Sequence, residues 1–549
     1  MNKINFNIKL SVAVLAIAFF TLTGCKKDYL SFDYTDGGVF VDEIWASDRH
    51  SRGFLNNAYL GILRRYDITD GALLASASDE AVNSNQGSTI NIFNNGTWGP
   101  LRTLDDQYAN MYNYIRRTNL FLERSPTSKI NPITDVPELR AQAFFLRAYY
   151  HFELFKRYGE IIIVTRSFGP TENLDLPKNT FDEVVTQIVS DCDSAILNLP
   201  LSIADQGIGD KGRASQTAAM AIKARTLLYA ASPLNNPSGD VSKWQKAADA
   251  AKAIINTSKH SLLASAQFAN IWNYTSQAYN SEIVFASVAD NVNAIESANA
   301  PISYDGARGR TNPTQEMVDA FEMKTTGKPI TDPTSGYVAT TPYTNRDNRL
   351  GLFIMVNGST FKSRAVETFI GGKDNVITEV LTTTKTGYYM RKFLYDGANW
   401  AQNSTANLRR PWVHFRYAEV LLNYAEALNE ISGAVPEVYT YMNMIRARAG
   451  QPALPAGLTK DQMRLRIQNE RRVELCFEEH RFFDVRRWKK GEEFFNKPAT
   501  GVVITKTGTT LSYSYVTVDN RVFTEKNYRF PFPQGELNRG VNLKQNTGW

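Results

Sequence analysis

The chain is poor in the residues that bind metals or form disulfide frameworks. Its 549 residues include three cysteines and five histidines. Cys25, Cys192 and Cys476 are too few and too widely spaced for a disulfide framework or a Cys-x-x-Cys metal site. No two histidines stand three or four residues apart, so no helix face is expected to present a histidine pair to a metal. The sequence therefore predicts neither a bound metal nor a cofactor.

No charge of one sign dominates either. The chain has 61 Lys and Arg against 55 Asp and Glu, a net charge of +6, without a block of five or six like charges. This balance lacks the basic footprint of a nucleic-acid-binding protein, so no nucleic acid partner is expected. The 34 glycines and 21 prolines are too few for a fibrous or low-complexity protein. No apolar run after residue 25 reaches eighteen residues, the length of a membrane-spanning helix.

Catalytic motifs are also missing. The sequence contains no GxSxG, HExxH, Walker A or GxGxxG pattern. The prediction is therefore that the chain is not an enzyme and has no catalytic residues. One alternative stays open, because glycoside hydrolases use two carboxylates from distant positions that leave no local signature.

The N-terminus has the pattern of a secretory signal. Lys3 and Lys9 precede the uncharged run 10–22, whose thirteen residues are too few to span a bilayer. The next residues complete Leu22-Thr23-Gly24-Cys25, which resembles a bacterial lipobox. The resemblance implies that residues 1–24 are a signal peptide and that Cys25 is lipidated, since several acyl chains anchor a protein firmly. The alternative is an ordinary signal peptide with an incidental cysteine.

Helical periodicity dominates the rest of the chain. Apolar residues recur at helical spacing in segments near 48–65, 105–124, 137–158, 180–199, 215–231, 242–255, 413–428, 436–449 and 460–480. Segments starting near 137, 180, 215 and 242 are 43, 35 and 27 residues apart, unlike the fixed period near 34 of tetratricopeptide repeats. We expect a mainly α fold, a degenerate tetratricopeptide-like scaffold of about four helix pairs.

Strand-like segments are few and long loops are many. Short strands are expected at 160–165, 283–288, 352–356 and 388–394, and a hairpin at 502–518 that turns at Gly508. We divide the chain into a signal peptide at 1–24, an N-terminal region with tetratricopeptide-like helices at 25–260, and a C-terminal region at 261–549 with a loop-rich part and further helices. The two regions are expected to form one compact fold.

Four stretches of the chain follow one another in a characteristic order. They are RAQAFFLRAYYHFELFKRYGEIIIVT at 140–165; NPTQEMVDAFEMKTTGKPI at 312–330 followed by NRDNRL; RPWVHFRYAEVLLNYAEALN at 410–429, running on to IRARAG and NERRVELCFEEHRFFDVRRW; and FPFPQGELNRGVNLKQNTGW at the end. Together they resemble the SusD/RagB family of outer-membrane nutrient-binding lipoproteins. Each also has a structural interpretation. The charged residues of the third stretch are expected to form ion-pair networks around apolar neighbours: Arg471, Arg472, Glu474, Glu478, Glu479, Arg486 and Arg487.

The resemblance implies a location, a partner and a ligand class. Members of this family are lipid-anchored in the outer membrane, face the extracellular side, and cap a SusC-like TonB-dependent transporter. They bind a nutrient, usually an oligo- or polysaccharide, and pass it on without chemical turnover. A peptide is the other possible ligand class. The rival functions are a surface glycoside hydrolase with dispersed carboxylates and a helical-repeat scaffold of the cell envelope.

Two loops are the candidate ligand sites. Sugars present flat C–H faces ringed by hydroxyls, so a site needs exposed aromatic rings beside polar groups. Segment 81–101 has no charged residue but has five asparagines and Trp98, and segment 272–308 is rich in aromatics. The expected ligand-binding residues are Trp98, Tyr304 and Trp272, with Asp79, Asn83 and Arg308 as polar partners.

Overall fold

A computed structural model describes residues 35–36, 39–207, 210–268, 270–273, 279–291, 294–400 and 408–549. Cys25 and the predicted signal peptide lie outside the described residues. Within the described ranges, no helix is long and apolar enough to cross a membrane.

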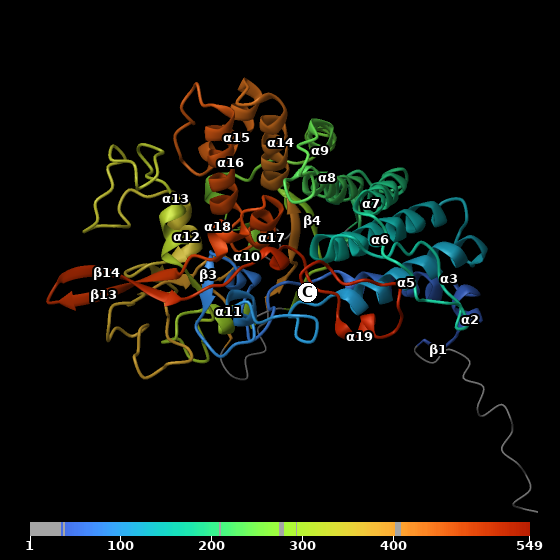
Figure 1. Cartoon of the computed structure of the whole chain (residues 1–549), viewed down its shortest axis with the longest axis horizontal. Helices are drawn as coiled ribbons and strands as arrows, with labels where there is room; N and C mark the ends of the chain where they lie inside the picture. The colour runs from blue at the N-terminus through green and yellow to red at the C-terminus, as the bar shows by residue number, and fades with distance from the viewer. Residues whose placement is uncertain are drawn as a thin grey trace, which may run out of the picture.

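An array of antiparallel helices forms one part of the molecule, so the predicted mainly α fold is confirmed. Each helix from α5 to α9 packs against the next one in the chain, and α14 then joins the array beside α9. Figure 1 shows the array running from α3 at the right to α9 at the centre, with α14, α15 and α16 beyond it. The bounds are α3 Asp48–Ala58, α5 Tyr108–Arg124, α6 Val136–Tyr158, α7 Phe181–Ile196, α8 Gln216–Ala231, α9 Val241–Asn256, α14 Tyr417–Ser432, α15 Pro436–Arg448 and α16 Lys460–Glu474.

Local sequence signals explain where several of these helices begin and end. The sequence pattern predicts a helix stop at Gly159, and α6 ends there, where φ of +79° suits glycine. It also predicts a cap at Thr180, and Thr180 and Glu183 cap each other's backbone at the start of α7. The same pattern predicts Ser242 as the cap of α9, which is wrong, because the side chain of Asp240 accepts a hydrogen bond from the backbone N–H of Ser242.

Three predicted helices are shorter than their periodicity indicated. The segment predicted at 48–65 ends as an α-helix at Ala58 and is followed by one 3-10 turn, Tyr59–Gly61. The segment predicted to be helical from residue 413 starts as strand β12 (Val413–Arg416), because it pairs with β4 (Ile283–Ala286) far earlier in the chain. Helix α14 therefore begins at Tyr417. The segment predicted at 460–480 breaks after α16, where Phe477 and Glu479 have positive φ, before α17 (His480–Arg487) begins.

The strands form isolated two-stranded antiparallel pairs among the described residues. The predicted hairpin is confirmed as β13 (Ala499–Thr507) and β14 (Thr510–Asp519), and it projects from the body in Figure 1. Segment 160–165 is not a strand. The other pairs are β1 Thr35–Asp36 with β2 Val39–Phe40, β3 Ala81–Asn83 with β6 Thr311–Pro313, β5 Asp290–Asn291 with β11 Arg409–Arg410, β7 Ile354–Met355 with β10 Tyr389–Met390, and β8 Thr360–Phe361 with β9 Arg364–Ala365.

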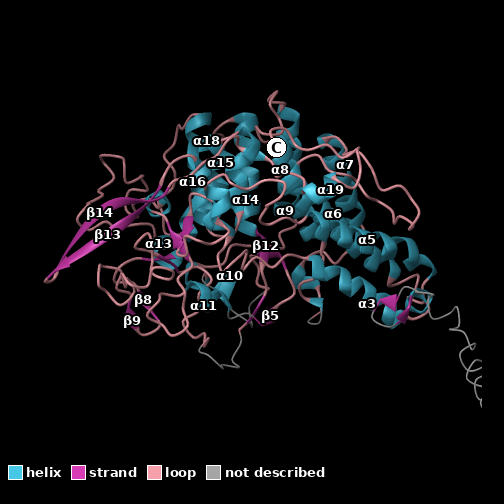
Figure 2. Ribbon diagram, turned by 60° about the horizontal axis from the view of Figure 1, so that its bottom comes forward, coloured by secondary structure: helices cyan, strands magenta, loops and turns pink. Residues whose placement is uncertain are grey.

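Long loops and short helices make up the second part, at the left of Figure 2. Its own apolar cluster includes Met317, Phe353, Tyr388 and Phe477. The core of the helical array draws residues from both sides of position 260; the predicted division there stays a prediction. The short helices of this part are α10 Asn270–Asn273, α11 Ala294–Asn299, α12 Gln315–Ala320 and α13 Asn348–Phe353. Three others pack against the core of the helical array: α2 Val41–Trp45, α4 Asn91–Asn94 and α19 Gln534–Leu537. Helix α18 Gly491–Phe495 contributes to a separate small cluster.

Candidate functional site

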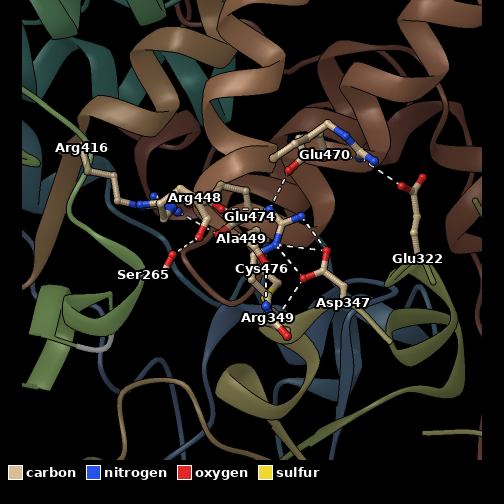
Figure 3. A network of polar contacts seen from close by, with 12 residues as sticks. Ser265, Glu322, Asp347, Arg349, Arg416, Arg448, Ala449, Glu470, Glu474 and Cys476 are labelled. Atoms are coloured by element: carbon tan, nitrogen blue, oxygen red, sulfur yellow. Dashed lines mark hydrogen bonds and ion pairs between the residues drawn. The ribbon is translucent and has the colours of Figure 1, made fainter. Parts of the chain in front are cut away.

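A buried network of arginines and carboxylates joins the loop-rich part to the helical array (Figure 3). Arg349 of α13 contacts Asp347 at 2.7 Å, and its other nitrogen contacts Glu470 and Glu474 of α16 at 2.6 and 3.0 Å. On the opposite side Glu474 forms an ion pair with Arg416 of β12 at 2.6 Å. All these side chains are at most 3% exposed. The network therefore fixes how α13, α16 and β12 meet.

The electrostatics of Glu474 show why so many charges can be buried together. Burial opposes its ionisation, but Arg448, Arg416 and Arg349 outweigh burial and hold its pKa well below its usual range. The predicted ion-pair networks are confirmed for the six residues Arg471, Arg472, Glu474, Glu478, Glu479 and Arg487. Arg486 differs, because its guanidinium stacks 3.5 Å from the ring of Phe482 and donates to the Asn527 carbonyl.

Glu479 and His480, which are adjacent in sequence, do not form an accessible acid–base pair. Glu479 is paired with Arg65 at 2.5 Å, and both side chains are nearly buried. Burial lowers the pKa of His480 well below its usual value, so this imidazole is neutral near pH 7. A cavity of about 30 Å³ beside these residues holds no more than a water molecule or two. Among the described residues, no group of three or more His, Cys, Asp or Glu could hold a metal ion.

The expectation that Trp98 is exposed is wrong. Its side chain is 3% exposed and meets Phe93, Phe530 and Trp549 with ring centroids 4.8, 5.1 and 4.8 Å apart. Two of these rings come from residues more than 400 positions later, which no local pattern around Trp98 could indicate. Trp98 fills the space between segment 81–101 and the C-terminal residues Phe530–Trp549.

Trp272, Asp79 and Asn83 are also inside the molecule. Trp272 is 4% exposed, and Phe268, Phe353 and Phe393 surround it. Asp79 accepts hydrogen bonds from Nε and Nη2 of Arg481, both at 2.8 Å, and Asn83 is fully buried in β3. A sugar cannot reach these side chains without displacing the structure that covers them.

Tyr304 and Arg308 remain at the surface, on the loop after α11. The Arg308 side chain is exposed, whereas the Tyr304 ring is half-buried and its hydroxyl donates to the Phe361 carbonyl at 2.6 Å. Burial raises the pKa of the Tyr304 hydroxyl above its ordinary value, so it stays a neutral hydrogen-bond donor.

The structure places Trp400 beside Tyr304. Its indole N–H donates to the Asp305 carbonyl at 3.1 Å, and the ring lies nearly parallel to Phe361, with centroids 6.4 Å apart and planes 22° apart. Phe361 is buried and meets Tyr304 edge-on at 5.2 Å. We call Tyr304, Phe361 and Trp400 the aromatic surface cluster; it lies by β8 and β9, at the lower left of Figure 2.

Cations lie over the rings of this cluster. The Arg364 guanidinium is 4.4 Å from the Tyr304 centroid, and the Lys362 ammonium is 4.5 Å from the Trp400 centroid. Asp374 holds Arg364 with two contacts of 2.9 Å. Half-buried rings beside fixed cations and backbone carbonyls can contact the apolar face of a sugar while bonding its hydroxyls.

Sequence reasoning missed Trp400, Lys362 and Arg364. Trp400 stands in a Gly- and Asn-rich stretch, the same signal that favoured Trp98. That signal cannot tell which tryptophan the fold covers, because the covering residues are distant in sequence.

Comparison with known proteins identifies the family. The model described as the SusD family matches residues 270–549, and a second model, described as starch-binding and associating with the outer membrane, matches residues 53–228. The chain belongs to the SusD family. Two SusD-like relatives from Formosa agariphila agree: protein P2 is 25% identical over 78% of this chain and 76% of its own, and protein P38 is 23% identical over 89% and 92%.

Solved structures share the SusD-family fold. A SusD-like protein from Bacteroides fragilis superposes with a TM-score of 0.80 at 28% identity, covering 92% of this chain and 98% of its own. A laminarin-binding SusD-like protein gives 0.65 at 22% identity, covering 92% and 100%. Surface glycan-binding protein A from Bacteroides uniformis gives 0.67 at 20% identity, covering 91% and 99%. These likenesses support the expected tetratricopeptide-like helical scaffold.

Proposed function

We propose that this SusD-family chain binds an oligo- or polysaccharide at the cell surface and delivers it to a SusC-like TonB-dependent transporter. Membership of the family is the observation that carries the proposal. Two solved proteins of the same fold are named for binding laminarin or glycans, which supports carbohydrate as the ligand class here.

The aromatic surface cluster is the proposed binding site. Of the described candidates, Tyr304 and Trp400 combine partly exposed rings with neighbouring cations and an exposed carboxylate at Asp305. Aromatic faces that contact sugar rings, with polar groups at their edges, are the usual composition of such sites. Arg308 is a polar partner on the same loop.

Binding without turnover is part of the proposal. Glu479 is held in an ion pair with Arg65, and His480 is buried. Two carboxylates beside the cluster, Asp374 and Asp396, are paired with Arg364 and Arg391. Lipidation at Cys25 would hold the protein in the outer membrane, facing outward, where polysaccharide arrives.

A retention assay tests binding and catalysis together. The purified chain without its signal peptide should be retarded in native gels that contain its polysaccharide, and a reducing-end assay on the same mixtures should stay at background. Released reducing ends that grow with time would favour the glycoside hydrolase instead. A lack of retention across neutral and acidic glycans would favour the envelope scaffold.

A further inference from the structure

Lys362 is a cation without a carboxylate partner in the described part of the chain. Its ammonium donates to the Ala398 carbonyl at 2.7 Å and lies over the Trp400 ring. Two other cations lie over rings of the cluster, Arg364 over Tyr304 and Arg391 at 5.0 Å from the Phe361 centroid. Each is paired with a carboxylate, Arg364 with Asp374 at 2.9 Å and Arg391 with Asp396 at 2.6 Å. The positive charge beside Trp400 is therefore left for another group.

The backbone at Lys362 makes this choice of residue costly. The register of β8 and β9 leaves Lys362 and Ser363 as a two-residue turn, and Lys362 has φ of +53°. A side chain other than Gly, Asn or Asp costs about 1–2 kcal/mol in this left-handed region. A lysine therefore occupies a turn position at which a glycine or asparagine would be less strained.

The neighbouring loop adds one charge of each sign. Asp305 and Arg308 both expose their side chains there. A ligand that stacks on Trp400 therefore meets the Lys362 ammonium, which pairs with no carboxylate among the described residues.

We propose that the aromatic surface cluster selects an anionic glycan, with the Lys362 ammonium binding a carboxylate or sulfate on the sugar that contacts Trp400. This rests on the proposed function, since it requires carbohydrate to bind at this cluster. A charge-assisted hydrogen bond at a half-buried position is stronger than a neutral one and is screened less by salt than an exposed pair. Uronic acids and sulfated sugars share this chemistry.

The test compares binding to a glycan array carrying neutral, uronate and sulfated oligosaccharides at 0.15 M salt. Lys362→Asn removes the charge and tolerates the left-handed backbone, so it should fold as well as the wild type. Lys362→Arg keeps the charge, and Lys129→Asn removes one exposed charge far along the chain. Trp400→Ala tests whether the glycan binds at the cluster at all. Thermal melting checks that each variant is folded.

We expect acidic glycans to bind best and Lys362→Asn to weaken them about tenfold, the usual effect of one hydrogen bond to a charged group. Lys362→Arg and Lys129→Asn should stay within about twofold of the wild type. Binding to uronates alone or to sulfates alone would identify the acidic group. Neutral glycans that bind as tightly as acidic ones would overturn this inference, and so would acidic glycans that bind Lys362→Asn as tightly as the wild type. In either case, loss of binding in Trp400→Ala would still support the proposed function. Binding to no glycan would overturn both.

Discussion

At the residue scale, Glu80 is a buried carboxylate with a strongly raised pKa. It is 1% exposed, and one oxygen accepts the Phe477 N–H at 3.3 Å. The arginines nearby are committed to Asp79, which pairs with Arg481 and Arg472 at 2.8 and 3.0 Å. Burial, and then the charge of Asp79, raises the pKa of Glu80 to about 8.

This raised pKa makes stability depend on pH. Unfolded Glu80 loses its proton near pH 4.5, whereas the folded protein keeps it until about pH 8. The free energy of unfolding therefore falls as the pH rises through this window, and Glu80→Gln, which imitates the protonated form, should remove that loss. In denaturant titrations the variant should be the more stable protein at pH 8.5 and close to the wild type at pH 4.5. An equal pH dependence in both would contradict a protonated Glu80, and the exposed Glu525→Gln is the control.

Burial of Trp98 leads to a second residue-scale prediction. Trp98→Ala should destabilise the fold by about 3–5 kcal/mol, because the vacated space lies between Phe93, Phe530 and Trp549. Trp400→Ala should cost less, since its ring is half-buried. Denaturant unfolding measures both, and equal losses would show that exposure does not separate these tryptophans.

At the element scale, the buried network around Arg349 holds α13 against α16. Arg349→Met should cost about 3–5 kcal/mol, because it leaves Asp347, Glu470 and Glu474 with fewer cations in a buried site. Arg539→Met removes an arginine that is 76% exposed, and it should change stability by less than about 0.5 kcal/mol. Circular dichroism melts compare the two, and a matching small effect at both positions would argue against a structural role for the network.

The same scale shows what the sequence could and could not predict. Helices such as α6 were predictable because their apolar spacing and their stop at Gly159 are local signals. The start of α14 was not, since Val413–Arg416 has helical spacing but becomes a strand by pairing with Ile283–Ala286. The candidate site was predicted only in part: Tyr304 and Arg308 lie at the surface, whereas distant segments cover Trp98 and Trp272.

At the scale of the whole molecule, a helical array supports a loop-rich part that carries the proposed site. Antiparallel helices provide a rigid frame from local contacts, and loops held by such a frame commonly carry binding residues. The buried arginine network connects the two parts.

The predicted anchor is tested by Cys25→Ala. Without the thiol there is no acceptor for the lipid, so the protein should move from the outer-membrane fraction to a soluble one. Fractionation with immunoblotting measures this, and protease treatment of intact cells reports whether the wild type faces outward. Unchanged membrane location of the variant would show that Cys25 is not the anchor.

The most direct test of carbohydrate binding at the aromatic surface cluster is calorimetric titration of Trp400→Ala with a glycan that the wild type retains. Loss of one aromatic contact with a sugar should weaken binding about tenfold or more. Tyr515→Ala, which removes an aromatic side chain 49% exposed on β14, should bind as the wild type does. Unchanged affinity of a folded Trp400→Ala protein would contradict the account.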